Sequence, residues 1–142
     1  MPIYQCNTSK PLSPETKAAI AEEITRIHIA FTGGPEAFIN VVFSDLPLGS
    51  HYLGRSVRED GTLINAIVRA GRPLETRQAL LKALSASWSR LTGQPERNLV
   101  LRVEEADAAT ILEAGLVMPQ PGEEAAWFEK NKAALSEVKA AA

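Results

Sequence analysis

The chain begins Met1-Pro2, and this start is the first place where its residue types could do chemistry. Initiator methionine is commonly removed before a small second residue, and its removal would leave Pro2 with a free secondary amine on a rigid ring. An α-amino group has a pKa of about 8, and burial or nearby cations lower this value. Such an amine could act as a general acid or base. If Met1 stays attached, the Pro2 nitrogen is an amide without this chemistry.

Two arginines form the second candidate group. Arg69 and Arg72 follow the apolar run INAIV and flank Gly71, where the chain can turn and present both side chains on one side. A guanidinium group can bind a carboxylate through two hydrogen bonds, and a second one adds orientation and neutralises charge. The pair could therefore bind the carboxylate of a small acid. By residue type alone two solvated surface arginines are favoured, and the family resemblance described below reverses that preference.

A histidine and a glutamate are further candidates. His28 lies beside the apolar stripe of a predicted helix, where it could bind a substrate or serve the structure. Glu113 ends a short predicted helix at about 106–114 and is either a general base for water or a surface carboxylate. The other histidine, His51, is expected in a solvated loop. With Cys6 the only cysteine, the ligands for a metal site are too few, and no metal or cofactor is predicted.

The elements that must position these residues come from an internal duplication. Residues 13–36 recur as residues 73–96, sixty positions later, with seven of the 24 pairs identical. The same offset aligns the flanking segments, PIYQCN with TLINAI and FINVVF with NLVLRV. A single duplication without a gap explains this pattern, with repeats at about 2–44 and 62–104.

Each repeat is predicted to be a β-α-β unit. In the first, Ser13 is a favourable N-cap with Pro14 at the first helical position, and Gly33 ends the helix. Apolar residues recur between them at helical spacing. The expected strands lie at about 2–7, 38–44, 62–68 and 98–104, and the second helix lies at about 74–91.

Two β-α-β units with right-handed crossovers give an α+β fold, a four-stranded sheet with two helices on one face. The opposite face would expose apolar strands, so oligomerisation is expected. The rest of the single 1–142 domain is a C-terminal helical tail at about 106–139. It comprises the short helix already mentioned and a helix at about 123–139, whose Trp127 and Phe128 should dock on the same or a neighbouring subunit.

Composition limits the partners. The net charge of −2 and pI of about 5.7 provide no basic field for nucleic acid or an anionic membrane. No apolar run approaches the length of a membrane span, and the N-terminus lacks the features of a signal peptide. These features predict a cytoplasmic protein that binds neither nucleic acid nor membrane.

Several short motifs, in order and spacing, carry a resemblance to a known family. They run from Pro2 to about Phe128 and comprise PIY at the start, His28 followed by Thr32-Gly33, Leu53-Gly54, Arg69-Ala70-Gly71-Arg72, Glu113-Ala114-Gly115, PQPG at 119–122 and Trp127-Phe128. With the duplication, they resemble the tautomerase superfamily and, within it, the cis-3-chloroacrylic acid dehalogenase group. The resemblance implies a tautomerase-like fold, a homotrimer and an N-terminal proline as acid–base residue.

The resemblance also implies roles for the other candidates. In that group a histidine on the first helix helps to bind substrate, two arginines hold its carboxylate, and a tyrosine and a glutamate activate water. By position these roles fall on His28, on Arg69 and Arg72, and on Glu113, whereas the position of the tyrosine holds Arg102. Arg102 would either pair with Glu113 and lower its pKa, or enter the pocket as a third cation suited to a larger or doubly charged acid.

Three functions follow as hypotheses. The favoured one is a keto–enol tautomerase acting on a small 2-keto or α,β-unsaturated acid, because it needs only Pro2 and the arginines. The second is a hydratase or hydrolytic dehalogenase of cis-3-haloacrylate-like three-carbon acids, with Glu113 directing water. The third is a non-catalytic acid-binding protein or structural oligomer, which requires that Met1 be retained.

Overall fold

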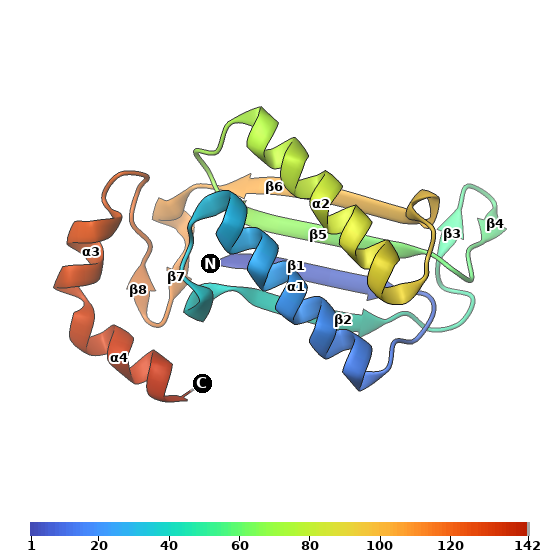
Figure 1. Ribbon diagram of the computed structural model, residues 1–142, viewed down its shortest axis with the longest axis horizontal. Coiled ribbons are helices and arrows are strands. Elements are labelled where there is room, and N and C mark those ends of the chain that lie inside the picture. The colour runs from blue at the N-terminus through green and yellow to red at the C-terminus, as the bar shows by residue number, and fades with distance from the viewer. Residues whose placement is uncertain (142) are drawn as a thin grey trace.

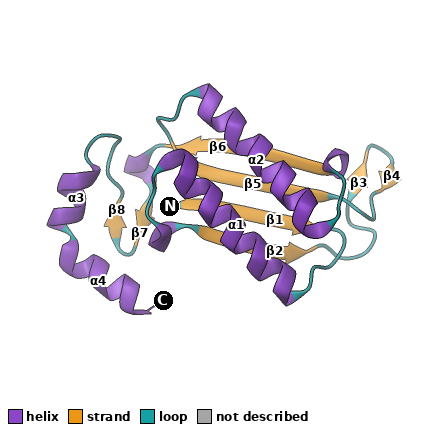
Figure 2. Ribbon diagram, viewed as in Figure 1, coloured by secondary structure: helices purple, strands orange, loops and turns teal. Residues whose placement is uncertain are grey.

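A four-stranded sheet with two long helices on one face forms the body of the molecule (Figures 1 and 2). The computed structural model describes the backbone of residues 1–141 and the side chains of residues 1–138. The strands lie in the order β2-β1-β5-β6, and the predicted α+β fold class is confirmed. The N-terminus lies at one end of the sheet, next to the C-terminal segment (Figure 1).

The first half follows the predicted pattern closely. Its elements are β1 (Pro2–Thr8), α1 (Pro14–Thr32), the 3-10 turn η1 (Glu36–Phe38) and β2 (Asn40–Asp45). Helix α1 begins where the Ser13 hydroxyl accepts a hydrogen bond from the Thr16 amide, and it ends at Gly33 with φ of 68°. Only glycine adopts this left-handed conformation without steric cost, so the predicted cap positions are the real ones.

The second half repeats these elements with β5 (Thr62–Arg69), α2 (Leu74–Thr92), η2 (Glu96–Asn98) and β6 (Leu99–Ala106). Within each half the two strands are parallel, as β-α-β crossovers require, whereas β1 and β5 pair antiparallel at the centre of the sheet. The antiparallel pairing turns the halves end to end. The N-terminus of β1 therefore lies beside the C-terminus of β5, with Pro2 opposite Val68.

The predicted helix at about 106–114 is wrong. The structure has one 3-10 turn, η3 (Ala108–Thr110), and then a hairpin of β7 (Leu112–Glu113) and β8 (Leu116–Val117). Ala114 and Gly115 both have positive φ, 53° and 75°, which a continuous right-handed helix excludes. The hairpin repeats the one formed by β3 (Tyr52–Leu53) and β4 (Ser56–Val57) sixty residues earlier.

The tail is two helices rather than the single one predicted. Helix α3 (Glu124–Lys130) ends at Asn131, and α4 (Lys132–Ala141) begins directly after it. The Asn131 side-chain amide donates to the Trp127 carbonyl at 2.8 Å, and its own amide donates to the same carbonyl at 3.1 Å. Asparagine favours such local bonds over continued helix, which accounts for the break.

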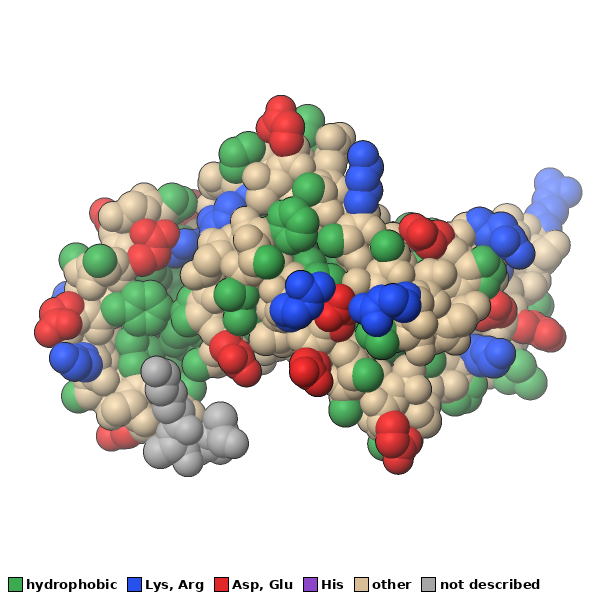
Figure 3. Space-filling view, in the orientation of Figure 1, with side chains coloured by type: hydrophobic (Ala, Val, Ile, Leu, Met, Phe, Trp, Pro, Cys, Tyr) green, Lys and Arg blue, Asp and Glu red, His purple; other side chains and the backbone are tan. Residues whose placement is uncertain are grey.

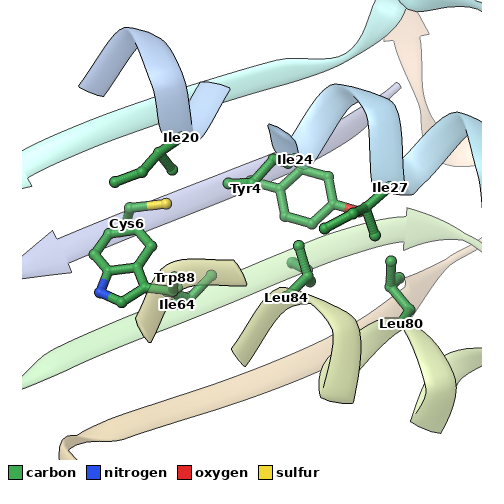
Figure 4. Packing of buried hydrophobic residues seen from close by; sticks show 10 residues of the cluster. Tyr4, Cys6, Ile20, Ile24, Ile27, Ile64, Leu80, Leu84 and Trp88 are labelled. Atoms are coloured by element: carbon green, nitrogen blue, oxygen red, sulfur yellow. The ribbon is translucent and has the colours of Figure 1, made fainter. Parts of the chain in front are cut away.

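The hydrophobic core lies between the helices and the sheet (Figure 4). Isoleucines of α1 and leucines of α2 meet Tyr4, Cys6 and Ile64 from the inner strands, with Trp88 at one end. The other face of the sheet is bare in the single chain, where Val42 and Val100 are 50% and 59% exposed. No helix within residues 1–141 is long and apolar enough to cross a membrane.

Candidate active site

A cavity of about 290 Å³ lies at the end of the sheet where the chain begins. Its walls are the start of β1, the end of α1, the residues after β5, and the segment that leads from η3 to α3. Four of the six predicted site residues line it, namely Pro2, His28, Arg69 and Arg72. The antiparallel pairing of β1 and β5 explains this, because it places the chain start next to the end of the strand that carries the arginines.

Pro2 is buried at the first position of β1, and Met1 precedes it in the structure. The terminal ammonium on Met1 lies 2.6 Å from Glu113 Oε2, and Asn40 donates to Glu113 Oε1 at 3.0 Å. Burial lowers the pKa of this amine, although the nearby Glu113 carboxylate opposes the shift. Glu113 does not line the cavity, but it is held beside the chain end by an asparagine that the sequence analysis did not single out.

The two arginines, at the last residue of β5 and just after it, make different contacts. Arg69 donates through Nη1 to the Pro119 carbonyl at 2.9 Å and forms an ion pair through Nη2 with Glu124 at 2.6 Å. Arg72 makes one long hydrogen bond, 3.3 Å, to the Thr32 carbonyl at the end of α1. Burial, and then the charge of Arg69, lower the pKa of Arg72.

Gly71 between the arginines has φ of 113°, and a Cβ there would lie 2.9 Å from the Pro121 ring. A larger residue would push away the segment that covers the cavity, so the turn and the cover depend on the same glycine. Aromatic packing holds the cover from the other side, where Phe38 contacts Trp127 and Phe128 with ring centroids 6.4 Å apart. The tail therefore docks on its own chain, one of the two outcomes expected for it.

His28 is 4% exposed, and its Nδ1 lies 2.7 Å from the Tyr4 hydroxyl oxygen. Burial, followed by the charges of Arg72 and the N-terminus, lowers the pKa of His28 to about 4, so the ring is neutral at physiological pH. Burial also raises the pKa of Tyr4, which keeps its hydroxyl protonated. With Tyr4 as the donor, the imidazole proton lies on Nε2, at the side of Gly34 and the cavity.

Arg102 takes neither of the two predicted positions in this chain. It is 64% exposed on the bare face of the sheet and pairs with Glu104. Side chains two residues apart in a strand share a face, which explains the pairing and keeps Arg102 away from Glu113 and the cavity. The expectation of a solvated His51 is also only partly right, because the ring is half-buried with Nδ1 2.8 Å from Ser9 Oγ.

Sequence reasoning missed Glu124 and Tyr4 as site residues. Tyr4 lies within the PIY motif, and Glu124 lies between the PQPG and Trp127-Phe128 motifs. Nothing in the sequence indicated that Glu124 would pair with Arg69, because the two residues are 55 positions apart.

Comparison with known families decides the relationship. A family model described as putative oxalocrotonate tautomerase enzyme matches residues 1–132. The chain belongs to this family. The predicted tautomerase-superfamily membership is thus confirmed, and members of this superfamily are generally enzymes. A search of curated proteins found no match.

Solved structures of tautomerase-fold proteins agree with this placement. The crystal structure of N1, a member of the cis-3-chloroacrylic acid dehalogenase family, is 26% identical and covers 96% of this chain and 98% of its own, with a TM-score of 0.89. The protein Ps01740 is 34% identical, with 78% and 99% covered and a TM-score of 0.75. A fused 4-OT described as a symmetric trimer, 17% identical, has a TM-score of 0.75 over 82% and 94% of the chains and shares the fold.

Proposed function

We propose that this tautomerase-family protein is a keto–enol tautomerase that uses the Pro2 amine as general acid and base on a small 2-keto or α,β-unsaturated carboxylic acid. The observation that carries the proposal is one cavity lined by Pro2 together with Arg69 and Arg72. A volume of about 290 Å³ suits a small acid. The proposal requires that Met1 be removed, which transfers the terminal amine from Met1 to Pro2.

The chemistry is a proton transfer between oxygen and carbon. The neutral Pro2 amine takes the hydroxyl proton of an enol, and the resulting ammonium delivers a proton to the neighbouring carbon, so that the amine returns to its starting state. Burial lowers the pKa of the Met1 amine in the unprocessed chain. Pro2 is itself buried, so burial should likewise favour the neutral, basic form of the amine that removal of Met1 would expose there. A guanidinium holds the carboxylate, and the N–H of neutral His28 can donate to the substrate oxygen.

The second candidate is the hydratase or hydrolytic dehalogenase. The position of Glu113 beside the chain end favours it, because a carboxylate there could take a proton from water while the Pro2 ammonium protonates the adjacent carbon. Addition of water to C3 of a 3-haloacrylate gives a halohydrin, which expels halide as its hydroxyl proton is lost and leaves an aldehyde. Glu113 is needed for this reaction and is dispensable for simple tautomerisation.

We further propose that the chain forms a homotrimer. A fused 4-OT of the same fold is described as a trimer, and the bare sheet face exposes Val42 and Val100, which a neighbouring subunit would cover. In such an assembly the exposed Arg102–Glu104 pair would lie at or near a subunit boundary. A monomer by light scattering would contradict the trimer.

One set of assays separates the candidate functions. Intact mass of the purified protein is measured first, because a retained Met1 would favour the non-catalytic alternative. The processed protein is then assayed with the enol of phenylpyruvate and, in parallel, with 3-haloacrylates and propiolate. We expect ketonisation of the enol, unchanged in Glu113→Gln and in the control His51→Ala. Halide release that Glu113→Gln abolishes would instead establish the dehalogenase.

A further inference from the structure

The segment that covers the cavity brings a carboxylate into it. Glu124, the first residue of α3, lines the cavity and pairs with Arg69 through Oε1 at 2.6 Å. Its second oxygen accepts from the Gly122 amide at 2.7 Å, so the carboxylate is held at both ends. The backbone amides and Arg69 lower the pKa of Glu124, which keeps it ionised.

This contact changes what Arg69 can offer a ligand. The two terminal nitrogens of its guanidinium are used within the chain, one by Glu124 and the other by the Pro119 carbonyl. The side chain of Arg69 is 14% exposed, whereas that of Glu124 is 37% exposed, so the pair lies at the wall of the cavity with the acid toward solvent. A substrate carboxylate that bound Arg69 would have to compete with the Glu124 carboxylate.

Arg72 is in a different state. Among the described residues it forms no ion pair within 4 Å, and its one hydrogen bond is to the Thr32 carbonyl. Glu105, another acid whose charge acts on Arg72, forms an ion pair with Arg77 at 3.3 Å and accepts a hydrogen bond from the Gly71 amide at 2.9 Å. Among the described residues, Arg72 is therefore the arginine of the cavity whose charge is not paired with a carboxylate.

The two arginines of the cavity then contribute one uncompensated positive charge. Arg69 is balanced by Glu124, which leaves Arg72. A monocarboxylate neutralises that charge, whereas the second carboxylate of a diacid would lie close to Glu124 with no free cation to pair with. Like charges at such short range repel strongly where water is partly excluded.

We propose that Glu124 is a specificity-determining residue that restricts this site to monocarboxylic acids by neutralising Arg69, with Arg72 as the carboxylate receptor. The inference rests on the proposed function, since it assigns the substrate class of the same cavity. It also narrows the expectation that both arginines hold the substrate carboxylate.

The test compares two saturated acids of equal length, butyrate and succinate, which bind without reacting. Their dissociation constants are measured by titration calorimetry with the processed wild-type protein, Glu124→Gln and the control Glu123→Gln. Glu123 is the exposed neighbour of Glu124 and its substitution makes the same change in net charge. We expect the wild type to prefer butyrate, and Glu124→Gln to shift the ratio of the two constants toward succinate by about tenfold at low salt. Glu123→Gln should leave the ratio within about twofold.

A second variant separates charge from structure. A glutamine removes the charge and can accept only one of the two hydrogen bonds of Glu124, because its amide nitrogen is a donor. Glu124→Asp keeps the charge and both acceptor oxygens while it shortens the side chain. If Glu124 acts by charge, the aspartate variant retains the wild-type ratio. If it serves only to hold the cover, the aspartate variant alters the binding of both acids alike and the glutamine variant leaves their ratio unchanged, which would overturn the inference.

The proposed function has its own readout in the same experiment. Arg72→Gln should weaken both acids at least about tenfold if the cavity is the carboxylate site. An unchanged ratio in Glu124→Gln, together with a loss in Arg72→Gln, would refute the role of Glu124 and leave the site intact. Binding of both acids that is insensitive to Arg72→Gln, or no binding by the wild type, would refute the site and the inference together.

Discussion

The two halves of the chain form equivalent places at opposite ends of the sheet, and only one of them holds the groups to which we assign the proposed chemistry. A shift of sixty residues carries Pro2, His28 and Gly34 onto Thr62, Trp88 and Gln94 at the opposite end of the sheet. The two helices end alike, since the hydroxyl groups of Thr32 and Thr92 each donate to the backbone carbonyl four residues earlier at 2.8 Å. The fold alone therefore does not make the site.

At the second end the side chain of Gln94 lies beside Trp88, and a cavity of about 340 Å³ lined by Thr62 and Gln94 lies next to it. Gln94 Oε1 accepts hydrogen bonds at 2.8 Å from both the Thr62 hydroxyl and the Trp88 indole, and its amide donates to Asp60 at 3.0 Å. At the first end the corresponding residue is Gly34, where even a Cβ would contact His28 Nε2 at 3.4 Å. An absent side chain thus leaves space next to His28.

The second end also lacks a chain terminus and arginines. The equivalent of Met1 is Gly61, so the nitrogen of Thr62 is an ordinary amide within a continuous chain. The equivalents of Arg69 and Arg72 are Ser9 and Leu12. A free amine can exist at one end only, because a chain has one start. The two arginines, Arg69 and Arg72, lie at that same end.

The largest effect is expected from Pro2→Ala. Loss of the secondary amine and its rigid ring should lower kcat/KM for the enol by about 100-fold or more, in the range of a general acid–base group. The control is Thr62→Ala at the equivalent position, which should keep activity within about twofold. Steady-state ketonisation rates measure both, and wild-type turnover in Pro2→Ala would show that the secondary amine and its ring are dispensable, which contradicts the proposed role of Pro2.

A smaller effect is expected when Gly34 is replaced by glutamine, the residue at the equivalent position of the second end. The amide side chain of Gly34→Gln should enter the cavity and raise KM about tenfold or more, because a small acid would lose contacts that contribute about that much to its affinity. Gly34→Ala adds only a Cβ at 3.3 to 3.4 Å from its neighbours and should have a weaker effect in the same direction. Melting temperature is the control for folding. A KM unchanged in both variants would mean that substrate binds elsewhere.

The smallest effect concerns pH and stability. The pKa of His28 falls from 6.5 to about 4 on folding, so between these values the unfolded chain binds more protons than the folded one. The free energy of unfolding therefore falls as the pH drops through this window, and His28 contributes about 1 kcal/mol of that loss between pH 7 and pH 5.5. Denaturant titrations should show a shallower pH dependence in His28→Asn. An equal slope in both proteins would place the buried, neutral imidazole in doubt.

The repeat was readable in the sequence, but it was not followed far enough. Ser13, Pro14 and Gly33 marked the first helix correctly because capping depends on neighbours along the chain. The helix expected at about 106–114 was wrong although the same sixty-residue offset places 112–117 on the 52–57 hairpin. Asn131 likewise broke the tail through a side-chain bond that apolar spacing does not reveal.

Motifs and a family resemblance singled out Pro2, His28, Arg69 and Arg72, the four predicted site residues that line the cavity. Their meeting in one cavity depends on the antiparallel pairing of β1 with β5, which β-α-β periodicity does not specify. The states of the arginines were likewise beyond reach, because Glu124 pairs with Arg69 across 55 positions of sequence.

The duplicated elements, their caps and the available types of reactive side chain could be predicted from the sequence, because they depend on neighbours within a few residues. Three contacts became visible only in the folded chain: Arg102 lies on the bare sheet face, Glu113 forms an ion pair with the terminal amine, and Glu124 neutralises one of the two arginines. Such pairings depend on distances through space between elements that are remote in the chain, and burial then sets the charge that each group carries.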